Sequence, residues 1–287
     1  MLQAASLALN LLNDSAGLVI HFTRRRRNAD GGFRGRSAES DLYYTVFGTE
    51  SLIALQADFP LDLAVEFLQG FGGGESLDFI HLACLARCWA DLPGGRLSEP
   101  ARAEILQHIE RHRSRDGGYG LAAGAEHGGA YACFLALGAH QDLEADVPEE
   151  SGLADCLAHL EVGGGYANER GIGVGTTPTT AAAVCLFHHL GREVPAPATD
   201  WLLARRHPEG GFLATPDAPI PDLLSTATAL HALALAGVAL DELREPCLDF
   251  LDSLWNPRGG FQGSWADDTL DCEYTFYGLL ALGRLSA

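Results

Sequence analysis

The sequence predicts an all-α fold, an α/α toroid (barrel) in which six helical hairpins form an inner and an outer ring of helices. Three observations lead to this prediction: a repeated Gly-Gly-aromatic element, an almost wholly apolar helical stretch after each copy, and an amphipathic stretch before it. With 287 residues, of which 47% are hydrophobic, the chain can bury a large core. We expect residues 1–287 to form a single domain.

The Gly-Gly-aromatic element occurs five times in clear form, and its aromatic residues are Phe33, Tyr119, Tyr166, Phe212 and Phe261. The first interval is about twice the later ones, so a further copy is expected between the first two. A degraded copy is found there at 71–74. The paired glycines of the six copies therefore lie near residues 32, 73, 118, 165, 211 and 260.

An apolar helix is expected soon after each copy. The six predicted starts, aligned by their first residue, are Asp41, Asp78, His127, Thr177, Asp222 and Asp271. Asp and Thr are favourable N-cap residues, and Pro178 suits a first helical position. The segments that follow, such as 181–187 and 226–233, are apolar on all sides, which is typical of a buried helix.

The helices expected before the Gly-rich elements are different, because each has one polar face. Residues 61–68, 102–109 and 247–254 are examples. Hairpins made of one amphipathic and one apolar helix bury a shared core best when they close into a ring with the apolar helices inside. Signals for β-strands are nearly absent.

Composition narrows the function classes. The chain carries 38 acidic and 19 basic residues, a formal charge of −19, which argues against a nucleic-acid partner. The apolar run near the start is interrupted by Asn10, Asn13 and Asp14, so it predicts neither a signal peptide nor a membrane span. Seven cysteines without a Cys-x-x-Cys pair indicate reduced thiols. We expect a cytoplasmic protein that does not span a membrane.

The repeat, a Gly-Gly-aromatic element followed by Asp-x-x-[Tyr/His]-Thr and an apolar helix, resembles that of protein prenyltransferase β subunits. It is similar, more distantly, to squalene-hopene and other class II terpene cyclases. Residues 220–227 and 271–279 look like the last two repeats of a Rab-type geranylgeranyltransferase β subunit. The resemblance covers nearly the whole chain. It implies an isoprenoid diphosphate as ligand and a helical-repeat α subunit as partner.

The zinc site that the resemblance implies is incomplete. Asp222 matches the family's aspartate ligand, but Leu224 stands in the place of the cysteine and Tyr274 in the place of the histidine. Catalytic zinc needs three protein ligands and an open position. Cys272 is the available thiol for a rearranged site, and the alternative interpretation of Asp222 is a helix cap. The cofactor therefore stays open between zinc, Mg²⁺ and none.

The expected diphosphate site also departs from the family. Pro216 and Pro219 stand where the family has Arg and Lys, whereas residues 127–131 echo its His-Gly-Gly-Tyr. His127 is therefore a candidate hydrogen-bond donor to a diphosphate, with a cap or turn residue as the alternative. Arg170 is a further cation that is expected to reach the mouth of the barrel.

An acidic cluster formed by Asp267, Asp268 and Asp271 is the best candidate for an acid or a Mg²⁺ site. Its spacing matches the Asp-Asp-x-x-Asp motif of class I prenyl synthases, although there the motif lies within a helix of another fold, so chance is the alternative. The Asp-x-Asp-Asp motif of class II cyclases does not occur. Carboxylates held close together raise one another's pKa. The candidate catalytic residues are Asp222, Asp268, Asp271 and Tyr274.

The predicted ring brings the N-termini of the inner helices together at one end, which favours an anion there. The interior is expected to be lined by Tyr44, Phe47, His81, Tyr131, Phe134, Phe187, Tyr274 and Tyr277. Aromatic walls suit an isoprenoid chain and a carbocation. The first hypothesis is an isoprenoid-diphosphate-binding, prenyltransferase-like enzyme. The alternatives are a terpene cyclase-like enzyme that uses the acidic cluster and a non-catalytic toroid that acts as a binding scaffold.

Overall fold

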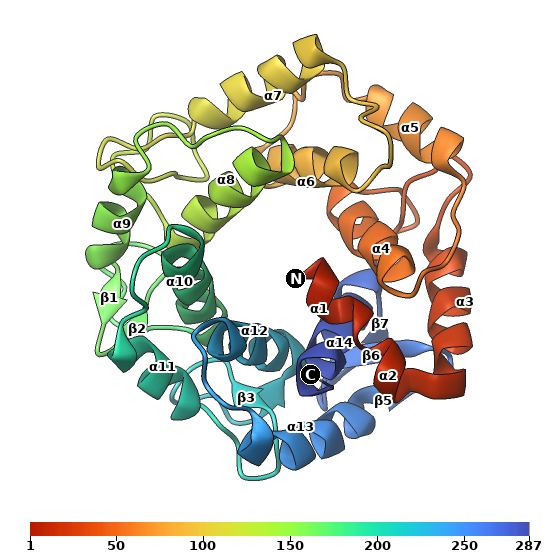
Figure 1. Cartoon of the computed structure of the whole chain (residues 1–287), viewed down its shortest axis with the longest axis vertical. Helices are drawn as coiled ribbons and strands as arrows, with labels where there is room; N and C mark the ends of the chain where they lie inside the picture. The colour runs from red at the N-terminus through yellow and green to blue at the C-terminus, as the bar shows by residue number, and fades with distance from the viewer. Residues whose placement is uncertain (287) are drawn as a thin grey trace.

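The computed structural model describes residues 1–286 and confirms the α/α toroid (Figure 1). Six of the helices in this part of the chain surround the central axis. They are α4 (Leu42–Ala54), α6 (Phe79–Ala90), α8 (Ala130–Asp142), α10 (Thr177–His189), α12 (Leu223–Leu235) and α14 (Cys272–Leu285). Each packs against the next, and α14 packs against α4 to close the inner ring.

A second set of helices forms the outer ring. These are α3 (Ala16–Arg26), α5 (Leu61–Gln69), α7 (Glu99–Glu110), α9 (Ser151–Ala158), α11 (Ala196–Leu203) and α13 (Asp241–Leu254). The chain enters through α1 (Leu2–Ser6), α2 (Leu9–Leu12) and a 3₁₀ turn at Asn13–Ser15. The main core lies between the two rings, where inner-helix residues such as Leu85 and Leu230 are fully buried.

Short antiparallel strands form in the Gly-rich loops, although the sequence predicted almost none. They are β1 (Glu161–Val162), β2 (Gly165–Tyr166), β3 (Phe212–Leu213), β4 (Pro221–Asp222), β5 (Trp255–Asn256), β6 (Gly260–Ser264) and β7 (Asp267–Leu270). β1 pairs with β2, the order β3-β4-β6-β5 forms a second sheet, and β7 pairs with β6. The chain reverses direction around the paired glycines, so the two arms of the loop meet and bond.

The Gly-Gly-aromatic element is a packing device, as the fifth copy shows. Gly210 has φ of +88°, and a Cβ atom there would collide with the carbonyl oxygen of Pro246 on α13. Phe212 is fully buried, and its backbone N–H donates to Thr226 Oγ1 at 2.9 Å. The Thr226 hydroxyl in turn donates to the carbonyl of Asp222 at 2.7 Å. In this copy, the packing of the chain is therefore sufficient to explain the glycine and the aromatic residue.

The helix starts agree with the predicted caps at four of the six inner helices. Asp41, Asp78, Asp222 and Asp271 each accept a hydrogen bond from a backbone N–H of the first turn. The other two starts differ slightly. α8 is capped by Gly129 rather than His127, and α10 by Thr176 rather than Thr177.

The later start of α8 is explained by close contact between the segment before it and the Gly-rich loop. A Cβ atom at Gly128 would come within 2.9 Å of the backbone nitrogen of Tyr119, so this segment runs extended against the Gly-rich loop. The helix begins only where the chain leaves that loop. His127 therefore lies in the loop before the helix.

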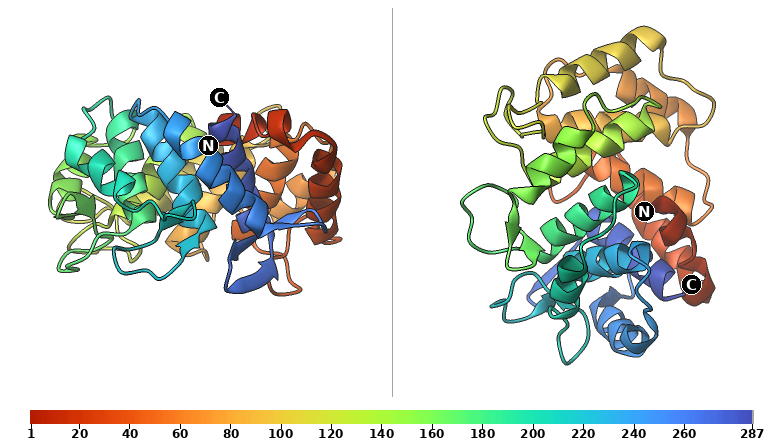
Figure 2. Two further views of the ribbon diagram at one scale, coloured as in Figure 1. Left: turned by 90° about the horizontal axis from the view of Figure 1, so that it is seen from below. Right: turned by 60° about the vertical axis from the view of Figure 1, so that its left-hand side comes forward.

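The two faces of the ring differ. The Gly-rich loops and the N-terminal ends of the inner helices lie on one face, while both chain termini lie on the other (Figure 2). α1 packs against α14 and α4 on the face of the termini. None of the helices in residues 1–286 is long and apolar enough to cross a membrane.

Candidate active site

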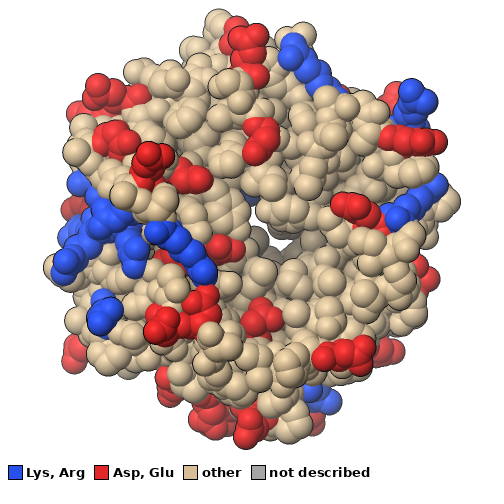
Figure 3. All heavy atoms as spheres, turned by 180° about the vertical axis from the view of Figure 1, so that it is seen from behind, with Lys and Arg blue, Asp and Glu red and all other residues tan. Residues whose placement is uncertain are grey.

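A cavity of about 670 Å³ occupies the centre of the ring. Its lining comes from all six inner helices, mostly from their first two turns, so it opens toward the face of the Gly-rich loops. That face is hollowed at its centre (Figure 3). The volume falls within the usual range of sites that enclose a small molecule, and the lining is largely apolar.

One register position faces the cavity in every inner helix. This position is the second residue after the N-cap, and its occupants are Tyr43, Ile80, Tyr131, Pro178, Leu224 and Glu273. Successive helical residues point about 100° apart, so the neighbouring third position points in another direction, although two of its occupants, His81 and Thr179, also line the cavity. The chemistry of the mouth is therefore set mainly by these six side chains.

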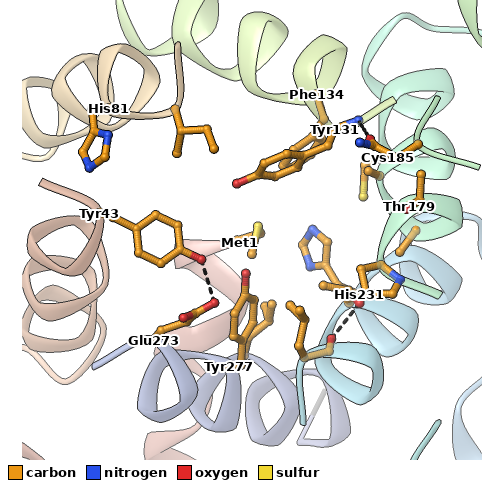
Figure 4. Close-up of a pocket in the computed structure, with 18 of the residues that line it drawn as sticks. Met1, Tyr43, His81, Tyr131, Phe134, Thr179, Cys185, His231, Glu273 and Tyr277 are labelled. Atoms are coloured by element: carbon orange, nitrogen blue, oxygen red, sulfur yellow. Dashed lines mark hydrogen bonds between the residues drawn. The ribbon is translucent and has the colours of Figure 1, made fainter. Parts of the chain in front are cut away.

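Glu273 is the acid of this group. The Tyr43 hydroxyl donates to its Oε1 at 2.7 Å, and the described residues provide no further hydrogen bond to Oε2 (Figure 4). Burial raises the pKa of the Glu273 carboxyl, and the hydrogen bond from Tyr43 and the charge of Arg36 partly oppose this rise. The carboxyl therefore holds its proton more readily than an exposed glutamate does, and it faces a largely apolar cavity.

The walls around this acid are aromatic. Tyr131 and Phe134 reach in from α8, and Tyr277 reaches in from α14, one turn beyond Glu273 (Figure 4). The Tyr43 ring contacts Phe47 edge-to-face, with ring centroids 5.0 Å apart. Burial raises the pKa of Tyr43, Tyr131 and Tyr277, so their hydroxyls stay neutral. Aromatic faces of this kind stabilise a cation that lies over them.

His81, a predicted cavity residue, lies at the mouth between two aspartates. Its Nδ1 is 2.8 Å from Asp78 Oδ1, and its Nε2 is 3.4 Å from Asp41 Oδ1. Both acids are helix caps, so the imidazole connects the starts of α6 and α4. Neighbouring acids offset a positive charge on His81, which makes it a poor anchor for a diphosphate.

His231 enters the cavity from α12, about two turns beyond the start of that helix. The Nε and Nη2 atoms of Arg284 lie 3.1 Å and 3.0 Å from its Nδ1. Burial lowers the pKa of His231 to about 2, and the charges of the Met1 amino group and of Arg284 act in the same direction. The imidazole is therefore neutral at physiological pH.

The residues expected to hold a diphosphate surround a separate depression of about 350 Å³ on the loop face. His127 Nδ1 and Arg170 Nη2 lie 3.5 Å and 3.8 Å from Asp116 Oδ2, so one carboxylate offsets both groups. Only Asn168 lines both this depression and the central cavity. The structure thus places His127 and Arg170 beside the cavity rather than in its wall.

In the acidic cluster, two of the three aspartates contact an arginine from the first Gly-rich loop. Arg36 Nη2 is 2.7 Å from Asp267 Oδ2, and Arg36 Nε is 3.5 Å from Asp271 Oδ2. Asp268 is exposed on β7, and Asp271 is fully buried as the cap of α14. None of the three lines the cavity. His127 precedes α8 and the acidic cluster precedes α14, and these two helices lie across the ring from each other (Figure 1). The two groups of residues expected near the diphosphate are therefore separated.

The predicted aromatic lining is partly found. His81, Tyr131, Phe134 and Tyr277 line the cavity, whereas Phe47 borders a smaller adjoining pocket. Tyr44 and Tyr274 point away from the axis, and their rings pack over Gly35 and Gly263 in the Gly-rich loops. Phe187 packs against Tyr166, whose backbone is part of β2. Tyr44 and Tyr274 occupy the third position after the cap, as His81 and Thr179 do, but only the two tyrosines pack over glycines of the Gly-rich loops instead of lining the cavity.

The residues present do not fit a catalytic zinc ion. Both carboxylate oxygens of Asp222 bind Ser225, at 2.7 Å from its N–H and 2.7 Å from its hydroxyl. Leu224 offers no donor atom, and Tyr274 lies over Gly263. Within residues 1–286 no group of three His, Cys, Asp or Glu side chains is arranged to hold a metal. In this structure Asp222 acts as a helix cap.

Sequence analysis missed Tyr43 and Glu273 as cavity residues. The signal for both was present, because each stands two residues after a predicted cap aspartate. The alignment of the repeats instead emphasised the third position, where Tyr44, His81 and Tyr274 stand. The pairing of His231 with Arg284 joins residues 53 apart and leaves no local pattern.

Comparisons with known proteins agree with this fold. Residues 2–166 and 178–285 match the family described as "Prenyltransferase alpha-alpha toroid domain", and the chain belongs to this family. A search of curated proteins finds no significant match. The family accounts for the repeat and the ring, while the reaction must be argued from the cavity.

Solved structures with the same fold include two functional types. A variant of the type II terpene cyclase MstE from Scytonema, in complex with geranylgeranyl dihydroxybenzoate, is 16% identical, with a TM-score of 0.66 and 97% of each chain covered. Protein geranylgeranyltransferase-I from Candida albicans, complexed with GGPP, is 14% identical, with a TM-score of 0.64, 98% of this chain and 91% of that chain covered. At these identities the likeness shows the fold alone.

Proposed function

We propose that this protein cyclises a polyisoprenoid chain by protonating one of its double bonds, as a terpene cyclase-like enzyme, with Glu273 as the proton donor. The observation that carries this proposal is the carboxyl group of Glu273, which faces an aromatic cavity of about 670 Å³ and has a pKa raised by burial. The Tyr43 hydroxyl holds it in place. The proposal agrees with the alternative hypothesis of the sequence analysis in reaction type, but it assigns the acid differently.

The reaction follows from general acid catalysis. The proton on Glu273 adds to the less substituted carbon of a double bond and leaves a tertiary carbocation on the other carbon. The π electrons of the next double bond then form a new carbon–carbon bond and move the cation along the chain. A carbon beside the final cation then loses a proton to water, and Glu273 regains a proton from the solvent. Substrate and product are therefore isomers and no redox partner is needed.

The surrounding residues support each stage. Tyr43 donates to Glu273, which stabilises the carboxylate that remains after proton transfer. The faces of Tyr131, Phe134 and Tyr277 lie where a cation in the cavity would meet them. The mainly apolar lining also offers few polar groups that would hold water beside the cation.

Protein prenyl transfer, the first hypothesis, has less support. It depends on a zinc-bound thiolate, and neither Leu224 nor Tyr274 supplies the missing ligands at Asp222. It also needs a cationic diphosphate site, and His127 and Arg170 share Asp116 as a neighbour. The helical-repeat α subunit stays a prediction that a pull-down would test.

The experiment is turnover by the wild-type protein and by Glu273→Gln, which keeps the size of the side chain but cannot donate an acidic proton. Farnesol, geranylgeraniol and their diphosphates serve as substrates, and products are identified by mass spectrometry. We expect cyclic isomers from the wild type and a rate at least about 100-fold lower in the variant.

The matched control is Glu39→Gln, which changes an exposed glutamate on the loop face in the same way. It should leave the rate unchanged. Binding without turnover in the wild type would contradict the proposal and favour the scaffold hypothesis. An unchanged rate in Glu273→Gln would show that another group is the acid.

A further inference from the structure

His231 is a buried polar side chain that the proposed reaction does not use. It is 6% exposed and lines the central cavity from α12. Its ring points into the open space between α8, α10 and α14 (Figure 4). In the part of the chain that the structure describes, its Nε2 has no hydrogen-bond partner. This nitrogen faces the cavity, where a ligand can bond to it.

Arg284 determines which nitrogen of His231 carries the hydrogen. Both its Nε and its Nη2 approach Nδ1, and a guanidinium group can only donate. Nδ1 must therefore accept, so in the neutral imidazole the hydrogen lies on Nε2. His231 consequently presents a fixed N–H donor to the cavity, and Arg284 is the positioning residue.

The other polar groups nearby are either engaged or adaptable. The hydroxyl of Thr228, one turn earlier on α12, donates to the carbonyl of Leu224 at 2.7 Å. The hydroxyls of Tyr131 and Tyr277 also face the cavity, but a hydroxyl rotates and both donates and accepts. The amide nitrogen of Asn168, which borders both the cavity and the depression on the loop face, also only donates, whereas His231 is a fixed donor further along α12.

The charge of the lining limits what this donor binds. No arginine lines the cavity within residues 1–286, the sequence contains no lysine, and the acids Asp41 and Glu273 are part of the wall. Two positive groups act on His231, namely Arg284, which is already bonded to its Nδ1, and the amino group of Met1. A diphosphate at His231 would therefore be desolvated with at most one further counter-charge, which is unfavourable. An uncharged oxygen atom of a ligand would need only the hydrogen bond from the His231 N–H.

We propose that His231, positioned by Arg284, binds an uncharged oxygen of the isoprenoid ligand, such as that of an alcohol, a carbonyl or an epoxide. His231 lies about 10 Å further along the barrel than Glu273, from the rise of 1.5 Å per helical residue. The ligand would thus extend from its oxygen at His231 toward a double bond at Glu273. This inference names the substrate class for the proposed function and rests on the same cavity.

The test compares the binding of two C15 probes by isothermal titration. They are farnesol and the matched hydrocarbon, in which a methyl group replaces the hydroxymethyl group. The protein carries Glu273→Gln to prevent turnover. We expect His231→Phe to reduce the preference for the alcohol over the hydrocarbon by about three- to tenfold, the value of one hydrogen bond. His231→Gln, which restores an N–H donor, should recover part of it.

Two further variants separate positioning from packing. Arg284→Met should reduce the alcohol preference as His231→Phe does, and NMR of the imidazole nitrogens should then show a mixture of tautomers. Thr228→Val is the control, because its hydroxyl is already bonded within α12, and it should leave the preference unchanged. Circular dichroism confirms that each variant is folded, and if His231→Phe is not, Arg284→Met and His231→Gln decide the question.

The outcomes distinguish this inference from the proposed function. An unchanged preference in folded His231→Phe, or an equal loss in Thr228→Val, overturns the role of His231 and leaves the acid at Glu273 intact. Tighter binding of farnesyl diphosphate than of farnesol overturns the uncharged class. If neither C15 probe nor the diphosphate binds, both this inference and the proposed function fail.

Discussion

The pKa of Glu273 is set by burial and by a small set of neighbours with opposing effects. Burial and the charge of Asp271 favour the protonated form, whereas the Tyr43 hydroxyl and Arg36 favour the carboxylate. A general acid needs both kinds of neighbour, because it must hold a proton before the reaction and be stable as a carboxylate after losing it. Arg36 reaches this position from the first Gly-rich loop through its contacts with Asp267 and Asp271.

The pH dependence of the reaction should report on Glu273. Its pKa is raised by burial, so the active, protonated form predominates below that raised pKa and the rate falls as pH rises through it. Tyr43→Phe removes a hydrogen bond that favours the carboxylate. We therefore expect this falling limb to move to higher pH in Tyr43→Phe, while the maximal rate drops by about tenfold. Rates measured across pH in both proteins check this, and a limb that moves to lower pH would contradict it.

At the scale of elements, the aspartate caps and the Gly-Gly-aromatic turns direct the inner helices toward the axis. This part was predictable, because capping and glycine chemistry are local. The direction of each side chain was not, since the second and third residues after a cap point about 100° apart. Tyr44 and Tyr274 were expected to act in the cavity, and Tyr43 and Glu273 lie there instead.

Substitutions of Asp222 test whether this residue, which matches the family's aspartate ligand, is a helix cap or a catalytic group. Asp222→Ala should lower the free energy of unfolding by about 1 kcal/mol, because it removes the acceptor for the Ser225 N–H. Asp222→Asn keeps an oxygen in place and should cost only a few tenths of that value. Denaturant unfolding measures both. A full loss of turnover in a stable Asp222→Asn protein would restore a catalytic role for Asp222.

The glycines of the repeat should be sensitive to substitution in proportion to their contacts. Gly210→Ala places a Cβ atom against the Pro246 carbonyl at φ of +88°, so we expect a loss of about 3 kcal/mol in the free energy of unfolding. Gly237 has φ of +77° with open space around it, and Gly237→Ala should cost only about 1 kcal/mol. Similar losses in the two variants would show that backbone conformation alone, and not helix contact, explains the repeat.

At the scale of the whole molecule, ring closure joins the two ends of the chain. α14 packs against α4, and a Cβ atom at Gly259, before β6, would collide with the carbonyl of Leu18 on α3. The sequence predicted a ring, but the contact between Arg36 and Asp267, 231 residues apart, could not be read from a local pattern. The contacts of Arg36 with Asp267 and Asp271 are therefore part of ring closure.

If residues 1–287 form a single domain, as the sequence predicts, the ring should unfold in one cooperative step. We expect thermal unfolding followed by circular dichroism and by tryptophan fluorescence to give coincident curves, since tryptophans lie in separate repeats at Trp89, Trp201 and Trp255. Two separated transitions would indicate that part of the ring opens independently.

The most direct test of the account is turnover in D₂O with geranylgeraniol as substrate, followed by mass spectrometry of the product. Protonation of a double bond by Glu273, whose acidic hydrogen exchanges with solvent, predicts a cyclic isomer that retains one deuterium from the solvent. The same experiment with Glu273→Gln should give almost no product. A cyclic product without solvent deuterium, or one formed equally well by Glu273→Gln, would contradict the account.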